Sequence, residues 1–251
     1  MTRLSGKIAI VTGAGIGIGQ AIAKRFAAEG AHVWVTDING ETAEETVREI
    51  KDKGGAATAM VVDVSKGQDL TALVRNVEVA HARADILVNN AGILVRSELR
   101  QLSDADWDKL REVNVDAILR LSRDALPLLR KGQNPSIINI SSIMAHRGLR
   151  PLAAYTATKG AVTALTKGLA VEYAPFSIRV NWIAPGYIQT AITNRLLKLP
   201  PIKQALVDKT PMGRLGQPED LVGAAVFFAS DDSLYCTGAE LFVDGGMAAG
   251  L

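Results

Sequence analysis

Apolar runs and helix-like segments alternate along this chain. The apolar runs are almost continuous, as in parallel strands buried on both faces, and they predict strands at 8–11, 31–36, 57–62, 85–88, 136–140, 177–183 and 239–243. The segments between them predict helices at 20–27, 42–53, 69–81, 103–129, 155–173 and 218–229. Ser103 is a suitable N-cap for one of these helices, and Pro218 suits the first turn of another.

The alternation continues from end to end without a linker, a repeat or a low-complexity stretch. We therefore expect one α/β domain over residues 1–251, built on a doubly wound parallel sheet of about seven strands with helices on both faces. A chain of 251 residues is long enough to bury a full core.

Polar and glycine clusters follow the predicted strands at their carboxyl ends. They occupy 13–19, Asp37, Asp63, 89–90, 141–142 and 185–186. Ligands of such sheets bind beyond the carboxyl ends of the strands, so these clusters predict a single site.

The stretch from Thr12 to Gly19 joins the first strand to the first helix. Its glycines fit T-G-x-x-x-G-x-G through Gly13, Gly17 and Gly19, whereas the commoner G-x-G-x-x-G fails at Ile18 and Gln20. A strand, a glycine turn and a helix place a phosphate on the backbone N–H groups of the helix N-terminus. The alternative is an ordinary strand–helix loop.

Asp37 follows Gly19 by 18 residues, at the end of the second strand. A carboxylate there accepts hydrogen bonds from an adenosine ribose and repels a 2′-phosphate. The glycine turn and the residues directly after Asp37 contain neither Arg nor Lys, so the sequence favours NAD over NADP. The alternative for Asp37 is a solvated loop position.

Tyr155 and Lys159 are four residues apart at the start of a predicted helix and therefore share one face. An ammonium beside a phenol favours the phenolate and lowers its pKa, so Tyr155 could act as a general base near neutral pH. The alternative is a surface pair. Ser142, 13 residues upstream, could hold a substrate oxygen, and so could Ser141.

Asn114 lies within a predicted helix between apolar neighbours. A mid-helix Asn usually faces solvent or bonds locally, but these neighbours make a buried, hydrogen-bonded Asn plausible here.

Together these motifs resemble the short-chain dehydrogenase/reductase (SDR) family, whose fold is of the Rossmann type. The resemblance covers essentially the whole chain and rests on Thr12 to Gly19, Asn89 to Gly92, Asn114, Ser142, Tyr155 to Lys159, Pro185 to Thr190 and Thr237 to Gly246. It implies that Tyr155 is the acid/base, that Ser142 rather than Ser141 binds the substrate oxygen, and that Asn114 holds a water of a proton relay. It also implies that Lys159 binds the nicotinamide ribose and lowers the pKa of Tyr155.

The resemblance further implies a set of residues around the cofactor NAD. Asp63 and Val64 are expected at the adenine, Asn90 at the adenosine ribose, and Ile188 and Thr190 at the carboxamide. The full expected set is Gly13, Gly15, Ile16, Gly17, Ile18, Asp37, Ile38, Asp63, Val64, Asn90, Tyr155, Lys159, Ile188 and Thr190.

The composition narrows the range of partners. The formal net charge of +2 gives no sign of a nucleic-acid or membrane surface, and the apolar runs are too short for a membrane span. Cys236 is the one cysteine, which excludes an intrachain disulfide or a cysteine metal cluster, and we expect no metal site. The first residues do not resemble a signal peptide, so we expect a cytoplasmic protein.

These observations predict an NAD(H)-dependent oxidoreductase that interconverts a secondary alcohol and a ketone. The alternatives within the family are a sugar or polyol dehydrogenase and a 3-oxoacyl-thioester reductase. Outside it, a non-catalytic NAD-binding scaffold remains possible on the same fold, and a methyltransferase would leave the Tyr/Lys pair unexplained.

Three segments are expected to wall the substrate pocket, namely 93–96, 143–147 and 187–199. A substrate lid is expected near 187–210, because Ile188, Ile192, Leu196, Leu197 and Leu199 make this stretch apolar. A short amphipathic helix is the alternative for these residues. An inward Arg96, His146 or Arg147 would instead favour a polyol, sugar or carboxylated substrate.

The helices at 103–129 and 155–173 carry more small and apolar residues than one sheet face needs. They predict a homo-oligomer, most simply a homotetramer, and the family resemblance adds the C-terminal strand as an interface. Burial of both helices within the monomer is the alternative.

Overall fold

The computed structural model describes residues 2–191, 193–194 and 198–250. The residues Ile192, Leu196 and Leu197 of the expected lid lie outside this part of the chain. The described strands are β1 (Ile8–Thr12), β2 (His32–Asp37), β3 (Ala56–Val61), β4 (Ile86–Asn89), β5 (Ser136–Ile140), β6 (Arg179–Pro185) and β7 (Glu240–Val243). They form one parallel sheet in the order β3-β2-β1-β4-β5-β6-β7, which confirms the predicted fold class.

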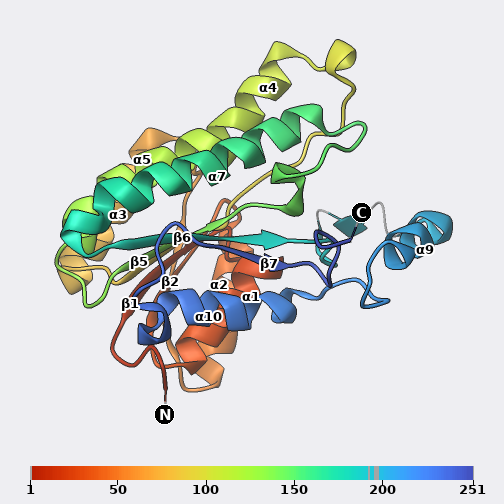
Figure 1. Ribbon diagram of the computed structural model, residues 1–251. Helices are drawn as coiled ribbons and strands as arrows, with labels where there is room; N and C mark the ends of the chain where they lie inside the picture. Colours follow the sequence, from red (N-terminus) through yellow and green to blue (C-terminus); the bar gives the residue numbers. More distant parts are fainter. Residues whose placement is uncertain (1, 192, 195–197, 251) are drawn as a thin grey trace.

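Helices cover both faces of this sheet (Figure 1). The α-helices are α1 (Gly17–Ala28), α2 (Gly40–Asp52), α3 (Gly67–His81), α4 (Asp104–Arg111), α5 (Ala117–Asp124), α6 (Leu126–Leu129), α7 (Ala153–Tyr173), α9 (Pro200–Asp208) and α10 (Val222–Ala229). The short helices are η1 (Leu99–Gln101), η2 (Glu112–Asp116), η3 (Ile143–Ala145), η4 (Ala174–Phe176), η5 (Pro218–Leu221) and η6 (Asp231–Ser233). Figure 1 shows α3, α4, α5 and α7 on one face and α1, α2 and α10 on the other.

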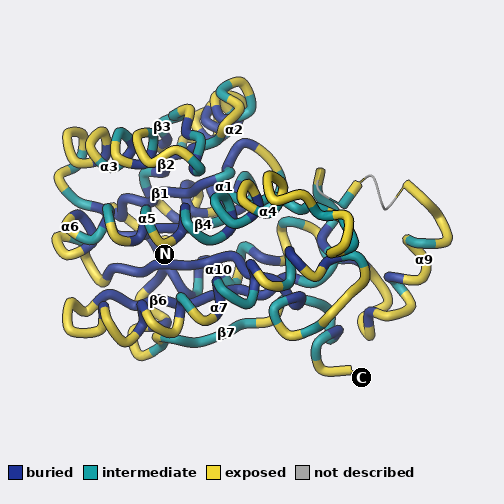
Figure 2. The backbone as a smooth tube through the Cα atoms, turned by 90° about the horizontal axis from the view of Figure 1, so that it is seen from above, coloured by how far each residue is buried: buried dark blue, intermediate teal, exposed yellow. Residues whose placement is uncertain are grey.

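Two hydrophobic cores therefore flank the sheet. Ala9 and Val11 of β1 belong to the core that contains Phe26 of α1, whereas Ile8 and Ile10 belong to the opposite core. Successive side chains of a strand point to opposite faces, so a continuous apolar run supplies both cores at once. Figure 2 shows these strands as buried, with exposed residues on the outer turns and on α9.

The strand order reverses between β1 and β4, since β1 pairs with β2 on one side and with β4 on the other. The chain crosses over in opposite directions from these two strands. A crevice opens where two such crossovers diverge, at the carboxyl ends of the strands. The glycine turn after β1 and the Asn-Asn pair at the end of β4 face each other at this point.

The prediction of one continuous helix at 103–129 is wrong, because this segment is divided. The chain forms α4, then a π-helical turn from Glu112 to Asp116, and only then α5 and α6. A π-turn inserts one extra residue into a helix, which turns a side chain to a face that regular spacing would not give it. The predicted helix at 218–229 likewise begins with the 3-10 turn η5, stabilised by a capping box between Gln217 and Asp220. Most other boundaries differ from prediction by only a few residues.

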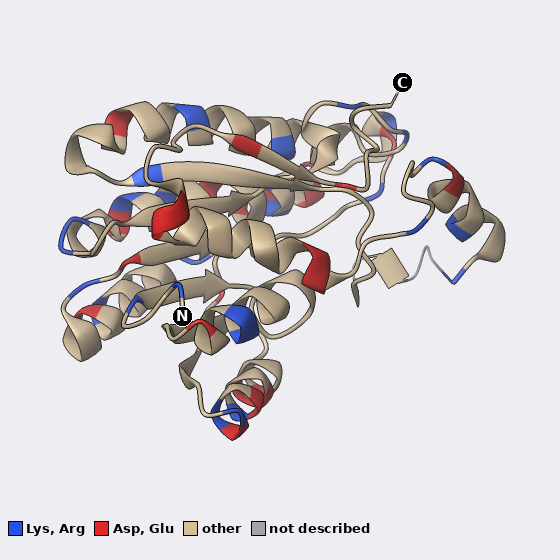
Figure 3. Ribbon diagram, turned by 60° about the horizontal axis from the view of Figure 1, so that its bottom comes forward, with Lys and Arg blue, Asp and Glu red and all other residues tan. Residues whose placement is uncertain are grey.

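Charged residues are spread over the outer helices and loops, with both signs interspersed (Figure 3). Among the described residues, no helix combines the length and apolar character that crossing a bilayer requires. The same part of the chain contains no group of three or more His, Cys, Asp or Glu side chains placed to hold a metal ion.

Candidate active site

The glycine turn between β1 and α1 is tightly packed against the end of β4. Gly13 has a φ of +61°, and a Cβ there would lie 2.9 Å from the Cα of Ala91. A Cβ on Gly19 would lie 2.2 Å from the carbonyl oxygen of Gly13. Both positions therefore require glycine.

This turn leads into α1, which begins after the extended residue Ile16. Among the described residues, no side chain caps this helix and its first turn contains no acidic residue. The free N–H groups and the positive end of the helix dipole suit an anion such as a pyrophosphate.

The Asp37 carboxylate is fixed beside this turn. Its Oδ2 accepts a hydrogen bond from the Gly15 N–H at 2.9 Å, and its Oδ1 accepts one from the Asn39 N–H at 3.0 Å. Asp37 is thus a half-buried part of the crevice wall rather than a loop side chain free in solvent.

Asn90 braces the same turn from the end of β4. Its Nδ2 donates to the carbonyl oxygens of Thr12 and Gly13, both at 2.9 Å. Asn90 lines the crevice, but its amide hydrogens bind the protein backbone. A contact from Asn90 to a ribose would therefore use its amide oxygen.

Ser142, Tyr155 and Lys159 meet at the carboxyl end of β5. The Lys159 Nζ is buried, donates to the carbonyl oxygen of Ile140 at 2.8 Å and lies 5.8 Å from the centre of the Tyr155 ring. Ser142 lies beside the Tyr155 side chain, and its Oγ accepts from the Met144 N–H at 3.1 Å, whereas the Ser141 hydroxyl donates to the Lys159 carbonyl at 3.1 Å. The structure thus separates the two serines, with Ser142 beside the phenol and Ser141 packed against α7.

The expected lowering of the Tyr155 pKa is wrong for this structure. Burial raises the pKa of Tyr155 to about 12, and the hydrogen bond with Ser142 only partly opposes this. Burial also lowers the pKa of Lys159 to about 8, and its amine is directed at the Ile140 carbonyl instead of the phenol oxygen. Desolvation disfavours the charged form of each group, and here it outweighs the attraction that the spacing alone predicts.

Asn114 is fully buried in the π-helical turn, as its apolar neighbours suggested. Its Oδ1 accepts from the Ile93 N–H at 2.8 Å, and its Nδ2 donates to the Ile93 carbonyl at 3.0 Å and to the Thr158 hydroxyl at 3.2 Å. Thr158 in turn donates to the Tyr155 carbonyl at 2.8 Å. Asn114 therefore ties the loop after β4 to the first turn of α7.

One cavity of about 580 Å³ joins these features. The predicted residues that line it are Gly13, Ile16, Gly17, Ile18, Asp37, Ile38, Asp63, Val64, Asn90, Ser142, Tyr155, Lys159, Ile188 and Thr190. Gly15 and Asn114 lie behind its wall. Lys109 of α4 and Val113 of the π-turn also line it and were missed, because the hydrophobic spacing does not show which face of this helix meets the cavity.

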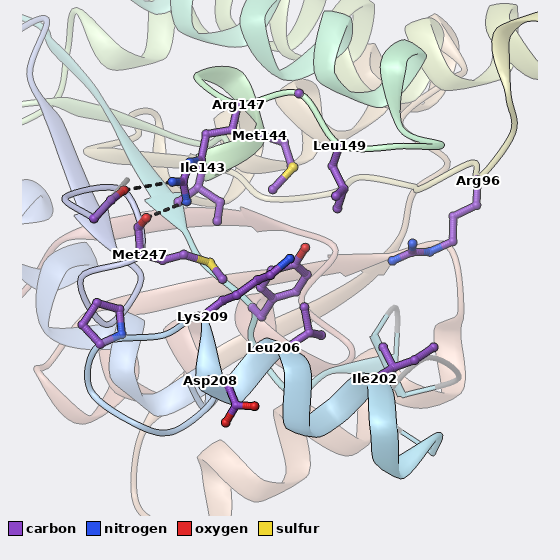
Figure 4. Close-up of a pocket in the computed structure, with 14 residues that line it drawn as sticks. Arg96, Ile143, Met144, Arg147, Leu149, Ile202, Leu206, Asp208, Lys209 and Met247 are labelled. Carbon is purple, nitrogen blue, oxygen red and sulfur yellow. Dashed lines mark hydrogen bonds between the residues drawn. The ribbon is translucent and has the colours of Figure 1, made fainter.

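A second cavity of about 770 Å³ is lined by Ile143 and Met144, the residues directly after Ser142 in the chain (Figure 4). Its walls include the predicted residues Arg96, Ile143, Met144, Arg147 and Tyr187. The third candidate cation, His146, instead pairs with Glu240, with 2.7 Å between His146 Nε2 and Glu240 Oε1. Met247 and Gly250 also line this cavity, and sequence reasoning missed them because the chain must fold back after β7 to reach it.

Comparison with known proteins shows the family to which this chain belongs. The family model described as enoyl-(acyl carrier protein) reductase matches residues 13–248. The chain belongs to the short-chain dehydrogenase/reductase family, a family of Rossmann-fold oxidoreductases.

Three relatives show the range of activities near this chain. Cyclopentanol dehydrogenase of Comamonas sp. (strain NCIMB 9872) is 39% identical over 99% of this chain and 100% of its own. The 3-oxoacyl-[acyl-carrier-protein] reductase FabG of Thermotoga maritima is 36% identical over 98% of this chain and 99% of its own. The crystal structure of a gluconate 5-dehydrogenase from Burkholderia cenocepacia J2315, in complex with NADP and tartrate, is 36% identical and covers 100% of this chain and 99% of its own at a TM-score of 0.94.

Proposed function

We propose that this protein is an NAD(H)-dependent dehydrogenase that interconverts a secondary alcohol and a ketone. The observation that carries the proposal is that Asp37, Ser142, Tyr155 and Lys159 all line one cavity, which also contains the glycine turn. The cofactor fits this cavity on three grounds: the closely packed glycines, the uncapped start of α1 and the fixed Asp37 carboxylate.

When bound, the nicotinamide would supply the hydride acceptor for oxidation and the hydride donor for reduction. In oxidation, Ser142 would hold the substrate hydroxyl while Tyr155 takes its proton. In reduction, the Tyr155 phenol would donate that proton to the carbonyl oxygen. Asn114 and Lys159 would keep the first turn of α7 in place, and the family resemblance adds a ribose contact for Lys159 and a relay water at Asn114.

Asp37 supports NAD over NADP. A carboxylate at the end of β2 accepts hydrogen bonds from ribose hydroxyls and repels a 2′-phosphate. The Lys or Arg residues among the described lining of this cavity are Lys109 and Lys159, and Lys159 lies at the opposite end from Asp37, beside Tyr155. The NADP bound to the Burkholderia relative is a property of that protein.

The test is the absorbance of NADH during incubation with cyclic alcohols, linear secondary alcohols, polyols, sugars and hydroxyacyl thioesters. We expect turnover with NAD and a lower kcat/KM with NADP. A clear preference for NADP would refute the cofactor proposal. Binding of NAD without turnover of any of these compounds would favour a non-catalytic scaffold instead.

We further propose a homotetramer that uses α4–α7 and β7, with a substrate lid formed by the segment around α9. Ala157, Ala164, Gly168 and Val171 recur at helical spacing on the exposed face of α7. A smooth helix face of this kind suits close packing against a second helix. For the lid, the supporting observation is that Ile202 and Leu206 of α9 line the second cavity.

A further inference from the structure

The second cavity lies where the remainder of a substrate would extend from the reacting carbon. Ile143, Met144 and Met247 line this cavity and form a small apolar cluster with Leu152, and the rings of Tyr155 and Tyr187 pack against this cluster. A substrate oxygen held at Ser142 and Tyr155 would therefore place the rest of the molecule along these apolar side chains.

Among the described residues that line this cavity, the cations are Arg96, Arg147 and Lys209, and the carboxylate is Asp208. The Arg147 guanidinium already binds the protein backbone. Its Nη1 donates to the Met247 carbonyl at 2.6 Å and its Nη2 to the Gly250 carbonyl at 2.9 Å. Asp208 is held on α9, where its Oδ1 accepts from Gln204 at 2.7 Å. Arg96 and Lys209 remain as the donors that can meet a ligand.

Arg96 differs from the other arginines around it. Arg100 and Arg150 both pair with Glu98, whereas Arg96 forms no ion pair or hydrogen bond with the residues that the structure describes. In Figure 4 the Arg96 side chain extends into the cavity from one wall and that of Lys209 from the wall formed by the end of α9. The positive charges of Arg96 and Arg147 also oppose the rise that burial causes in the pKa of Tyr187, so both charges are felt inside the cavity.

We propose that the substrate carries a carboxylate at its far end, bound by Arg96 and Lys209, with an apolar body between this carboxylate and the reacting carbinol or ketone carbon. The inference rests on the proposed function and specifies its substrate class. A guanidinium fork matches the two oxygens of a carboxylate, and an ammonium adds a third donor without restricting direction. The apolar walls between these cations and Ser142 favour a hydrocarbon spacer over a polyol chain.

The test compares hydroxy acids with their uncharged amides. The probes are secondary-alcohol forms of hydroxybutyrate, hydroxyhexanoate, hydroxydecanoate and hydroxycyclohexanecarboxylate, each with its primary amide. They are oxidised with NAD at pH 7.5, where all four acids are ionised. For at least one pair, we expect the acid to exceed the amide in kcat/KM by about tenfold or more, the effect of a charge-assisted hydrogen bond.

The variants R96Q and K209Q should each reduce this acid-to-amide ratio by about fivefold or more. The ratio is measured within each variant, so a general loss of activity does not affect it. R100Q is the matched control, because Arg100 lies four residues further along in η1, pairs with Glu98 and is not among the residues that line the cavity. Its ratio should equal that of the wild type.

Equal kcat/KM for acids and amides across the series would overturn the inference, as would a ratio that R96Q and K209Q leave unchanged. If neutral alcohols are oxidised without any preference for acids, the inference alone fails. If none of the alcohols is oxidised with either cofactor, the proposed function fails and the inference with it.

Discussion

Tyr155 is the residue on which the proposed chemistry depends most directly. Tyr155→Phe keeps the ring and removes the hydroxyl, so we expect kcat to fall by about 10²–10⁴-fold, the usual contribution of a general acid or base. Steady-state oxidation at saturating substrate measures this. Tyr235→Phe is the matched control, since Tyr235 is fully exposed, and it should keep wild-type activity. A loss of less than about tenfold in the Tyr155 variant would contradict the assigned role.

The raised pKa of Tyr155 predicts a pH dependence with a definite sign. With a pKa of about 12, the phenol of the free protein is protonated at neutral pH, and its phenolate forms only as the pH rises. Proton donation to a ketone is therefore favoured at neutral pH, and alcohol oxidation should speed up as the pH increases. In the free protein, the difference in tyrosinate absorbance between wild type and Tyr155→Phe should emerge only above pH 10, the ordinary value for tyrosine. A difference already present near neutral pH would show that the charge of Lys159 outweighs burial.

Asp37 offers a separate test of cofactor choice. Asp37→Asn retains an acceptor for the Gly15 N–H but removes the negative charge that faces the 2′ position. We expect the preference for NAD over NADP in kcat/KM to narrow by about tenfold, which is about 1.4 kcal/mol. An unchanged ratio of the two kcat/KM values would mean that Asp37 does not discriminate between a 2′-hydroxyl and a 2′-phosphate.

The identities of these residues were predictable from the sequence, but their hydrogen-bond partners were not. The four-residue spacing of Tyr155 and Lys159 requires a shared helix face wherever the helix packs. The Ile140 carbonyl that accepts the hydrogen bond from the Lys159 amine belongs to β5. Only the packing of α7 against the sheet brings these two groups together. The direction of the Tyr155 pKa shift depends on this burial, so spacing alone gave the wrong sign.

At the scale of elements, the π-helical turn at Glu112–Asp116 fixes the loop that follows β4. Asn114→Ala would leave the half-buried Ile93 N–H and carbonyl without their partner. We expect a loss of about 1–3 kcal/mol in the free energy of unfolding, measured by urea denaturation. Asn76→Ala, at an exposed position on α3, is the control and should change stability by less than about 0.5 kcal/mol. Equal stabilities of the two variants would contradict the bracing role of Asn114.

The strands and most helices followed from the sequence because each apolar run serves two cores and each helix has one buried face. The break in the helix predicted at 103–129 did not follow. One inserted residue barely disturbs the hydrophobic spacing, yet it decides which side chains of this helix face the cavity. Val113, which lies in this π-turn, was missed for that reason.

For the whole molecule, the exposed face of α7 predicts self-association. Val171 is 78% exposed on this helix, and Val79 is 81% exposed on α3, outside the proposed interface. A charge buried in a helix–helix interface without a partner is strongly unfavourable, so Val171→Asp should dissociate the assembly and Val79→Asp should not. Light scattering at micromolar concentration distinguishes the two. A wild-type protein that is monomeric there would refute the tetramer.

The sequence predicted more of the overall architecture than of the second cavity. Alternating strands and helices leave few topologies open, because the crossovers between parallel strands are right-handed. The ligand site is then expected at the carboxyl ends of the strands. The second cavity, by contrast, is assembled from five separate stretches, around Arg96, Arg147, Tyr187, Leu206 and Met247. No local pattern marks such stretches as neighbours.

The bonds from Arg147 to Met247 and Gly250 have a practical consequence for handling the protein. The last described residues line the second cavity, where we propose that the substrate binds, while the N-terminus lies at the opposite end of the sheet (Figure 1). An affinity tag fused to the C-terminus would change the KM for the substrate, whereas the same tag at the N-terminus would leave the kinetic constants unchanged. Comparing the two fusions before any substrate screen would guard against discarding the true substrate as inactive.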